Sequence, residues 1–181
     1  MKFLIHVPIS IPISFSQDIL EHLKSMFNGI GFSIVSEPFT PPMITFDWHR
    51  GQFKGWEIIE YVKKKYSWSK TGQLVIIDSD GYEQGMNFVF GVTDFSSRIC
   101  LVFSSRLRET FYNKRENPSL LLERLKKESV HEVGHALGLD HCNDRKCAMS
   151  FSPSIIEVDY KSPSLCIKCS EKLARKLKSL T

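Results

Sequence analysis

The sequence contains no run of about eighteen apolar residues, the length that a membrane-spanning helix requires, so we expect no transmembrane segment. It also lacks internal repeats and low-complexity segments, which argues against a repeat protein or a disordered tract. The first residues imitate a signal peptide, with a lysine before apolar residues, but a small-residue cleavage site is missing. Because His6, Pro8 and Pro12 interrupt the apolar run, we expect a first β-strand there.

Cysteine is scarce, with five residues in 181, and four of the five fall into a spacing typical of metal ligands. This usage favours thiolates in a reducing compartment over a disulfide framework, and we expect a cytoplasmic protein. Cys100 stands apart, inside the apolar stretch from Ile99 to Phe103, where a buried free thiol behaves as a small hydrophobic group. We therefore assign Cys100 to the core and not to redox chemistry.

The net charge is only +4, and the whole excess lies from Asn143 onward, where eight basic residues face four acidic ones. A basic segment can attract nucleic acid, but the solvated face of an ordinary helix carries the same residues. We therefore expect neither nucleic acid nor a membrane as a partner. The length of 181 residues and the hydrophobic content of 42% suffice for one domain. We expect a monomer, although no pattern fixes the oligomeric state.

Hydrophobic periodicity predicts a chain of strands and helices in the α/β (α+β) class. The opening is a βαβ unit in which Ser16 is the expected cap of the first helix. The apolar side of the second helix runs through Trp56, Ile59 and Val62. The last two strands are joined by a turn short enough for antiparallel neighbours. The predicted strands are 2–7, 32–35, 74–77, 87–92 and 98–103, and the predicted helices are 15–27, 53–66, 118–137 and 170–180.

Three histidines and one glutamate between residues 131 and 141 carry the strongest chemical signal in the chain. Positions four apart share a helix face, so His131 and His135 can direct two ring nitrogens at one metal ion. Gly138 lets the backbone leave the helix in a left-handed conformation, and the turn that follows can bring His141 to the same ion. Glu132 directly follows the first histidine. The spacing predicts a metal site with three protein ligands.

Three ligands leave one tetrahedral position for water, which is the arrangement of a catalytic zinc ion rather than of a structural one. Zinc lowers the pKa of bound water to about 7 and polarises a carbonyl group. Glu132 would be the general base that takes a proton from this water and passes it to the leaving amine. The competing interpretation is an ordinary amphipathic helix, which requires a coincidence on the order of 10⁻⁵ to 10⁻⁴ per chain for this long motif.

The other four cysteines form a second pattern, a Cys-x4-Cys pair and a Cys-x2-Cys pair separated by eighteen residues. They are Cys142, Cys147, Cys166 and Cys169. This spacing is similar to that of zinc ribbons and predicts a closed site in which four thiolates bind a structural zinc ion. Such an ion would fasten a loop-rich C-terminal part that has too little apolar periodicity for its own core. Two disulfides are the competing account.

The two metal patterns in this order, with Met149 after the first cysteine pair, resemble the archaemetzincins, a family of the metzincin zinc metalloproteases. The resemblance runs from His131 to Cys169, about a fifth of the chain, and the stretch from Met149 to the final cysteine pair is one residue shorter than in the family. It implies two zinc ions per chain, one catalytic and one structural. It also implies a turn in which Met149 packs beneath the catalytic ion.

The resemblance further implies a mixed, twisted five-stranded sheet backed by helices above an active-site cleft. We expect one domain, with the sheet and the active-site helix in an N-terminal subdomain (1–138) and the cysteine site in a C-terminal subdomain (139–181). In the family an edge strand over the zinc pairs with a peptide substrate, and residues 87–92 are our candidate for that strand.

We therefore expect a zinc-dependent metallopeptidase that hydrolyses peptides or proteins. The alternative is a non-catalytic two-zinc module that contacts nucleic acid or a protein partner. Such a module has no need for a base such as Glu132 beside an open metal position.

Overall fold

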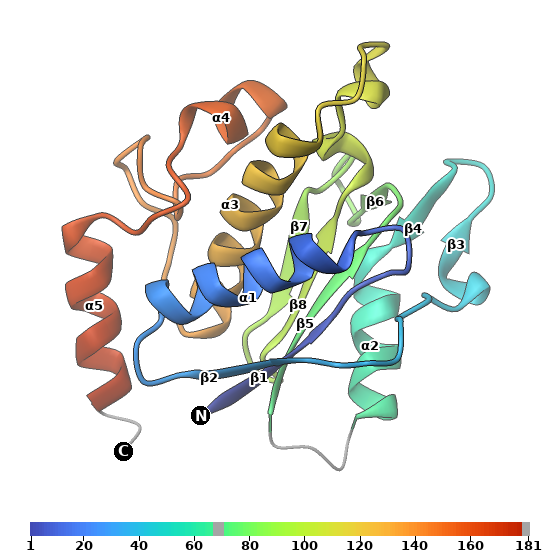
Figure 1. Ribbon diagram of the computed structural model, residues 1–181. Coiled ribbons are helices and arrows are strands. Elements are labelled where there is room, and N and C mark those ends of the chain that lie inside the picture. Colours follow the sequence, from blue (N-terminus) through green and yellow to red (C-terminus); the bar gives the residue numbers. More distant parts are fainter. Residues whose placement is uncertain (67–70, 179–181) are drawn as a thin grey trace.

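The computed structural model describes residues 1–66 and 71–178, in which strands and helices alternate (Figure 1). In chain order the elements are β1 (Lys2–His6), α1 (Ile13–Met26), β2 (Gly31–Ile34), β3 (Phe46–Asp47), β4 (Gln52–Lys54), α2 (Gly55–Lys65), β5 (Gly72–Ile77), β6 (Gly81–Tyr82), β7 (Gly91–Asp94), β8 (Ile99–Phe103), α3 (Pro118–Ala136), α4 (Ile155–Tyr160) and α5 (Ile167–Lys178). Short 3₁₀ turns occur at Met43–Thr45, Ser105–Leu107 and Glu109–Tyr112. Within the described residues, no helix has the length and apolar character needed to cross a membrane.

The main sheet has five strands in the order β2-β1-β5-β8-β7. The first four run parallel to one another, whereas β7 is antiparallel to β8 and forms one edge of the sheet. The central strands β5 and β8 are buried along their whole length, as parallel strands are when helices cover both faces. The expected mixed five-stranded sheet is therefore confirmed.

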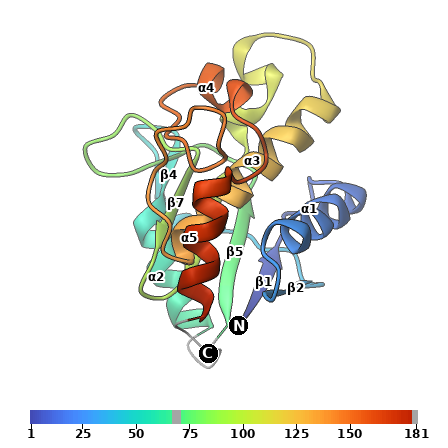
Figure 2. The same ribbon diagram turned by 90° about the vertical axis from the view of Figure 1, so that its left-hand side faces the viewer.

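Helices cover both faces of this sheet, and Figures 1 and 2 show α1 and α3 on one face and α2 on the other. Each face has its own apolar cluster, to which α3 contributes Leu125 and α2 contributes Ile59. Successive residues of a strand point to opposite faces, so in β8 Cys100 and Val102 join the α3 cluster, whereas Leu101 joins the α2 cluster. Cys100 is fully buried, as predicted, and lies on the side of the sheet that faces α3.

Helix α3 carries the histidine motif, and both of its ends follow from the sequence. The side chain of Asn117 accepts a hydrogen bond from Leu120 N at 3.1 Å and so caps the first turn. At the other end Gly138 has a φ of +85°, the amide of Leu139 bonds to Gly134 O at 2.9 Å, and the amide of Gly138 bonds to His135 O at 2.8 Å. These bonds form a Schellman motif, in which a glycine ends the helix and reverses the chain. The turn predicted at Gly138 is therefore present.

Ion pairs fasten the chain beyond α3 to the helix. Arg124, which is 2% exposed, makes two hydrogen bonds to the carboxylate of Asp159 in α4, at 2.7 and 2.6 Å. Lys161, directly after α4, has its Nζ 2.8 Å from Glu128 Oε1, and these two side chains are only 1% and 3% exposed. Two turns of α3 are thus tied to α4 and to the residue that follows it.

Several predicted boundaries are wrong. Helix α1 begins at Ile13 with Pro12 at the cap, and Ser16 is buried inside the helix, where its hydroxyl bonds back to Pro12 O at 3.4 Å. Helix α2 begins at Gly55 rather than at residue 53, because Phe53 pairs with a strand residue in a small second sheet of β3, β4 and β6. Trp56 is 46% exposed, so it does not belong to the buried side of that helix.

The edge strand and the C-terminal helices also differ from expectation. β7 spans Gly91–Asp94 and not 87–92, because the amide of Val89 bonds instead to Gly81 in the second sheet. The loop predicted after Gly138 contains the short helix α4, which Ser154 caps by accepting from Ile156 N at 3.2 Å. Helix α5 begins at Ile167 rather than at residue 170, and its predicted end at residue 180 lies outside the described residues. The division into subdomains at residue 138 stays a prediction.

Candidate metal centres

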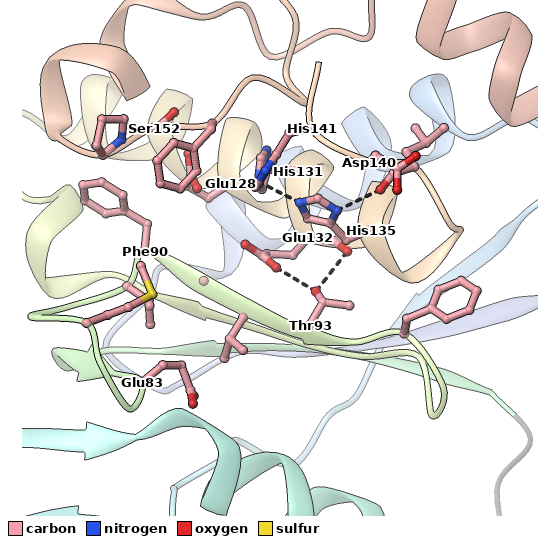
Figure 3. A pocket seen from close by; sticks show the side chains of 18 of the residues that line it. Glu83, Phe90, Thr93, Glu128, His131, Glu132, His135, Asp140, His141 and Ser152 are labelled. Carbon is pink, nitrogen blue, oxygen red and sulfur yellow. Dashed lines mark hydrogen bonds between the residues drawn. The ribbon is translucent and has the colours of Figure 1, made fainter. Parts of the chain in front are cut away.

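Helix α3 and the turn after it bring the three predicted histidines together (Figure 3). The ring centroids of His131 and His135 lie 4.6 Å apart, and that of His141 lies 5.3 and 4.8 Å from them. One nitrogen of each ring can be chosen so that all three lie within 4.8 Å of one another. His131 is buried, His135 is partly exposed and His141 is exposed, so the cluster is open on one side.

Hydrogen bonds identify the ring nitrogen that each helical histidine leaves free. The Nδ1 atoms of His131 and His135 lie 2.8 Å from the carbonyl oxygens of Ala148 and Leu139 respectively. Only a protonated Nδ1 can donate to a carbonyl, so each Nε2 carries a lone pair. These two Nε2 atoms are nevertheless 3.1 Å apart. Two ligands of a tetrahedral zinc ion with Zn–N distances of about 2.0–2.1 Å are about 3.3 Å apart, so the donor set fits zinc.

The electrostatics of the three rings agree with this assignment. Burial lowers the pKa of His131 well below its usual value, and Lys161 and the neighbouring imidazoles lower it further. Burial also lowers the pKa values of His135 and His141. All three rings are therefore held in the neutral form, which is the form that binds a metal ion.

Glu132 points from the same helix toward the edge strand β7 and is 3% exposed. Its Oε2 accepts a hydrogen bond of 2.7 Å from Thr93 Oγ1, which Figure 3 shows beneath the histidines. A side chain at Gly91 would collide with the Glu132 carboxylate, so the strand can pass this close only with glycine there. Burial raises the pKa of Glu132 to about 8. A cation beside the carboxylate would favour its charged form.

Met149 lies on the other side of α3, fully buried, where its side chain packs closely against Gly134. Its backbone oxygen accepts a hydrogen bond of 2.9 Å from Cys142 N, one residue beyond His141. The turn predicted to support the histidines is therefore packed directly against their helix. The sulfur atom of Met149 lies against Gly134. This contact agrees with a packing role for Met149 rather than with metal ligation.

The four predicted cysteine ligands also meet at one point. Their Sγ atoms all lie within 4.8 Å of one another, and those of Cys142 and Cys166 are 3.8 Å apart. A disulfide needs about 2.05 Å, whereas two thiolates on one tetrahedral zinc ion with Zn–S of about 2.3 Å are about 3.8 Å apart. Burial opposes ionisation of Cys166, but hydrogen bonds from Cys169 and the neighbouring thiols lower its pKa. The cluster thus fits zinc and not the competing pair of disulfides, since all the cysteines are free.

A cleft with a volume of about 910 Å³ runs between β7 and α3, and the three histidines line it. One end is lined by Phe95, Gly138 and Lys176, and the other end by Phe88, Phe90, Glu128, Phe151 and Pro153. The ring centroid of Phe151 lies 5.1 Å from that of His141. The metal cluster is therefore in the middle of a groove that can hold an extended chain.

Sequence reasoning missed Thr93, Glu128 and Phe151 as site residues. Thr93 is thirty-nine residues away from Glu132 and belongs to no motif, so only the fold brings the two together. Glu128 is on the same helix face as Glu132, one turn earlier, and that spacing was a usable signal. Phe151 follows Met149 closely, but nothing in its spacing separates it from a core residue.

Comparison with known proteins decides the family. The model of peptidase family M54 matches residues 59–175. An archaemetzincin of Saccharolobus solfataricus is 36% identical over 180 residues, which cover 99% of this chain and 97% of that protein. The chain belongs to peptidase family M54. An archaemetzincin of Sulfolobus acidocaldarius is 39% identical to this M54 chain over 84% of each protein.

Solved structures extend the likeness to the M54 fold. The crystal structure of an archaemetzincin from Methanopyrus kandleri has a TM-score of 0.80 and 34% identity, and the match covers 98% of this chain and 96% of that one. A zinc-dependent peptidase from Methanocorpusculum labreanum has a TM-score of 0.85 and 25% identity, with 96% and 100% covered. This M54 chain is therefore a zinc metallopeptidase with a peptide substrate, and the alternative of a non-catalytic module is rejected.

Proposed function

We propose that His131, His135 and His141 bind a catalytic zinc ion and that Glu132 is the general base in peptide-bond hydrolysis. The observation that carries the proposal is the 3.1 Å separation of the two Nε2 atoms while both Nδ1 atoms lie 2.8 Å from carbonyl oxygens. With both Nδ1 atoms protonated, the Nε2 lone pairs repel each other unless a cation lies between them. His141, the third ring of the cluster, is exposed, which leaves room for water and substrate.

A zinc ion bound there would supply Lewis acidity toward the scissile carbonyl and the attacking water. Glu132 would take a proton from that water and return it to the leaving amine. The Thr93 hydroxyl would hold one carboxylate oxygen in place, so that the other faces the reacting groups. The free edge of β7 would bind the backbone of an extended substrate as an added strand.

We also propose a second, structural zinc ion on Cys142, Cys147, Cys166 and Cys169, hence two ions per chain. The Sγ–Sγ separation of 3.8 Å supports this site. Met149 would support the catalytic site from below by packing against Gly134. Free thiols at ligand spacing suit a reducing compartment, and cytoplasmic location, a monomeric state and the absence of a nucleic-acid partner stay predictions.

The test is cleavage of a broad peptide library by the zinc-loaded protein and by its Glu132→Ala variant. We expect cleavage by the unmodified protein and its loss in the variant, with zinc content unchanged. Glu171→Ala is the control, since Glu171 is an exposed carboxylate of α5 with no ion-pair partner in the described part of the chain. Cleavage by the Glu132→Ala variant at the unmodified rate would overturn the assignment of the base.

Metal analysis tests the ligands separately. We expect two zinc ions per chain in the unmodified protein and one in His141→Ala, because the cysteine cluster contains no histidine. Two ions in His141→Ala would remove that residue from the ligand set. A single ion in the unmodified protein, with anomalous scattering only at the histidines, would refute the structural zinc.

A further inference from the structure

The end of the cleft beyond His131 combines aromatic walls with a charged base. Phe88, Phe90 and Phe151 line its sides, and Glu128 lines it from α3. In Figure 3, Phe90 lies below this space and Glu128 behind it, next to the histidines. We call this part of the cleft, lined by Glu128, Phe88, Phe90, Phe151 and Ser152, the Glu128 pocket.

Glu128 is paired with Lys161, and the two side chains are 3% and 1% exposed. A buried ion pair is weak evidence for stability, because desolvation of both charges offsets their attraction. Arg124 also ties α4 to α3, with two hydrogen bonds to Asp159 in that helix. A role in the pocket explains why the Glu128–Lys161 pair is buried there.

The base of the pocket still has hydrogen-bonding capacity. A carboxylate accepts about four hydrogen bonds, and Glu128 Oε1, although 2.8 Å from Lys161 Nζ, has no hydrogen-bond partner among the described residues. The buried Ser152 Oγ likewise has no hydrogen-bond partner among the described residues. A side chain with a donor at its tip would satisfy these acceptors, whereas an apolar one would leave them unpaired.

The edge strand indicates which substrate residue enters the pocket. Antiparallel pairing is the more stable arrangement, and a peptide added to β7 in that direction runs from the Phe95 end toward the Gly91 end. Phe90 and Glu128 lie beyond Gly91, on the side of the substrate's C-terminal half. The side chain directly after the scissile bond therefore faces the Glu128 pocket.

We propose that the Glu128–Lys161 pair makes this pocket selective for an uncharged aromatic side chain with a hydroxyl donor at its tip, namely tyrosine, directly after the scissile bond. The inference rests on the proposed catalytic site. Because Glu128 and Lys161 neutralise each other, the pocket offers no net countercharge to a basic or an acidic side chain. Phenylalanine fits the same aromatic walls but leaves the spare acceptor positions of Glu128 unfilled.

The first test compares peptides that are identical except for tyrosine or phenylalanine directly after the scissile bond. With the zinc-loaded protein we expect kcat/KM to be about 10-fold higher for tyrosine, the size of one hydrogen bond to a charged group. Equal values for the two peptides would overturn the proposal. A preference for tyrosine before the scissile bond, and none after it, would overturn the binding direction on which the proposal depends.

The second test removes the pair as a unit, with Glu128→Leu and Lys161→Met in one protein, so that no unpaired charge is left. We expect the ratio of kcat/KM for tyrosine over phenylalanine to fall to about 1, and the control Glu171→Ala to keep the unmodified ratio. A ratio that survives in the double variant, with its thermal melt intact, would assign the preference to other residues. If the double variant does not fold, the peptide comparison on the unmodified protein still decides.

Binding to the zinc-loaded Glu132→Ala variant separates this proposal from that of the catalytic site. We expect the tyrosine peptide to bind this inactive variant about 10-fold more tightly than the phenylalanine peptide. Equal binding would refute the pocket even if the unmodified protein cleaves peptides. Selective binding of the tyrosine peptide, without cleavage by the unmodified protein, would refute the catalytic proposal but support the proposal for the pocket.

Discussion

Replacing Thr93 by valine tests how the fold positions Glu132. The substitution keeps the β-branched shape that suits a strand and removes only the hydroxyl, whose oxygen lies 2.7 Å from Glu132 Oε2. A hydrogen bond to a charged group contributes roughly 1.5–3 kcal/mol, so a carboxylate that loses this partner should be misaligned for proton transfer. We expect kcat to fall about 10- to 100-fold. KM should change less than kcat, because both hydrogen bonds of the hydroxyl go to Glu132, although Thr93 itself lines the cleft.

The assay is steady-state cleavage of one peptide by the zinc-loaded variants, with zinc content measured in parallel. Thr93→Ser is the matched control, since it retains the hydroxyl and should keep most of the unmodified kcat. A valine variant that retains zinc and turns over within about two-fold of the unmodified protein would refute the positioning role. A serine variant as slow as the valine variant would show that shape, and not the hydrogen bond, matters at this position.

Three further predictions follow from the same geometry. Gly91→Ala should abolish cleavage but retain zinc, because the added methyl group would collide with the Glu132 carboxylate; unchanged activity would contradict that contact. Cys166→Ser should lower both the zinc content and the melting temperature, and an unchanged melt would count against a structural zinc ion. In the zinc-free protein, the lowered pKa of His131 predicts stability that is present above the usual imidazole pKa of about 6.5 and lost as the pH falls below it. Thermal melts at about pH 7.5 and about pH 5.5 measure this loss, which should shrink in His131→Gln.

The local features of the site could be predicted because each depends on residues close in sequence. His131, His135 and the turn at Gly138 follow from helix periodicity and from the need for a left-handed conformation, and both are present. The strands also followed from apolar runs such as β5, whereas their assembly into one mixed sheet was implied by the family resemblance. Rules based on sequence spacing are reliable where the local conformation or the chemistry of the site requires one residue type at a given position.

The long-range features could not be predicted, because their partners share no spacing. The Thr93–Glu132 contact depends on the register of β7 against β8 and on the way that α3 crosses the sheet. The shift of the edge strand to Gly91–Asp94 depends on the bond from Val89 to the second sheet, which the sequence did not reveal. Helix α4 is different, since Ser154 and Glu157 form a capping pair that was open to sequence reasoning and was overlooked.

The backbone links the cysteine cluster to the histidine cluster at two points. Cys142 directly follows His141, and Cys147 directly precedes Ala148, whose carbonyl oxygen holds Nδ1 of His131 at 2.8 Å. Two of the three histidines are therefore oriented by backbone that two of the four cysteines anchor. The reverse does not hold, because no histidine belongs to the cysteine cluster. Loss of the cysteine site should thus weaken the histidine site, whereas loss of His141 should leave the cysteine site intact.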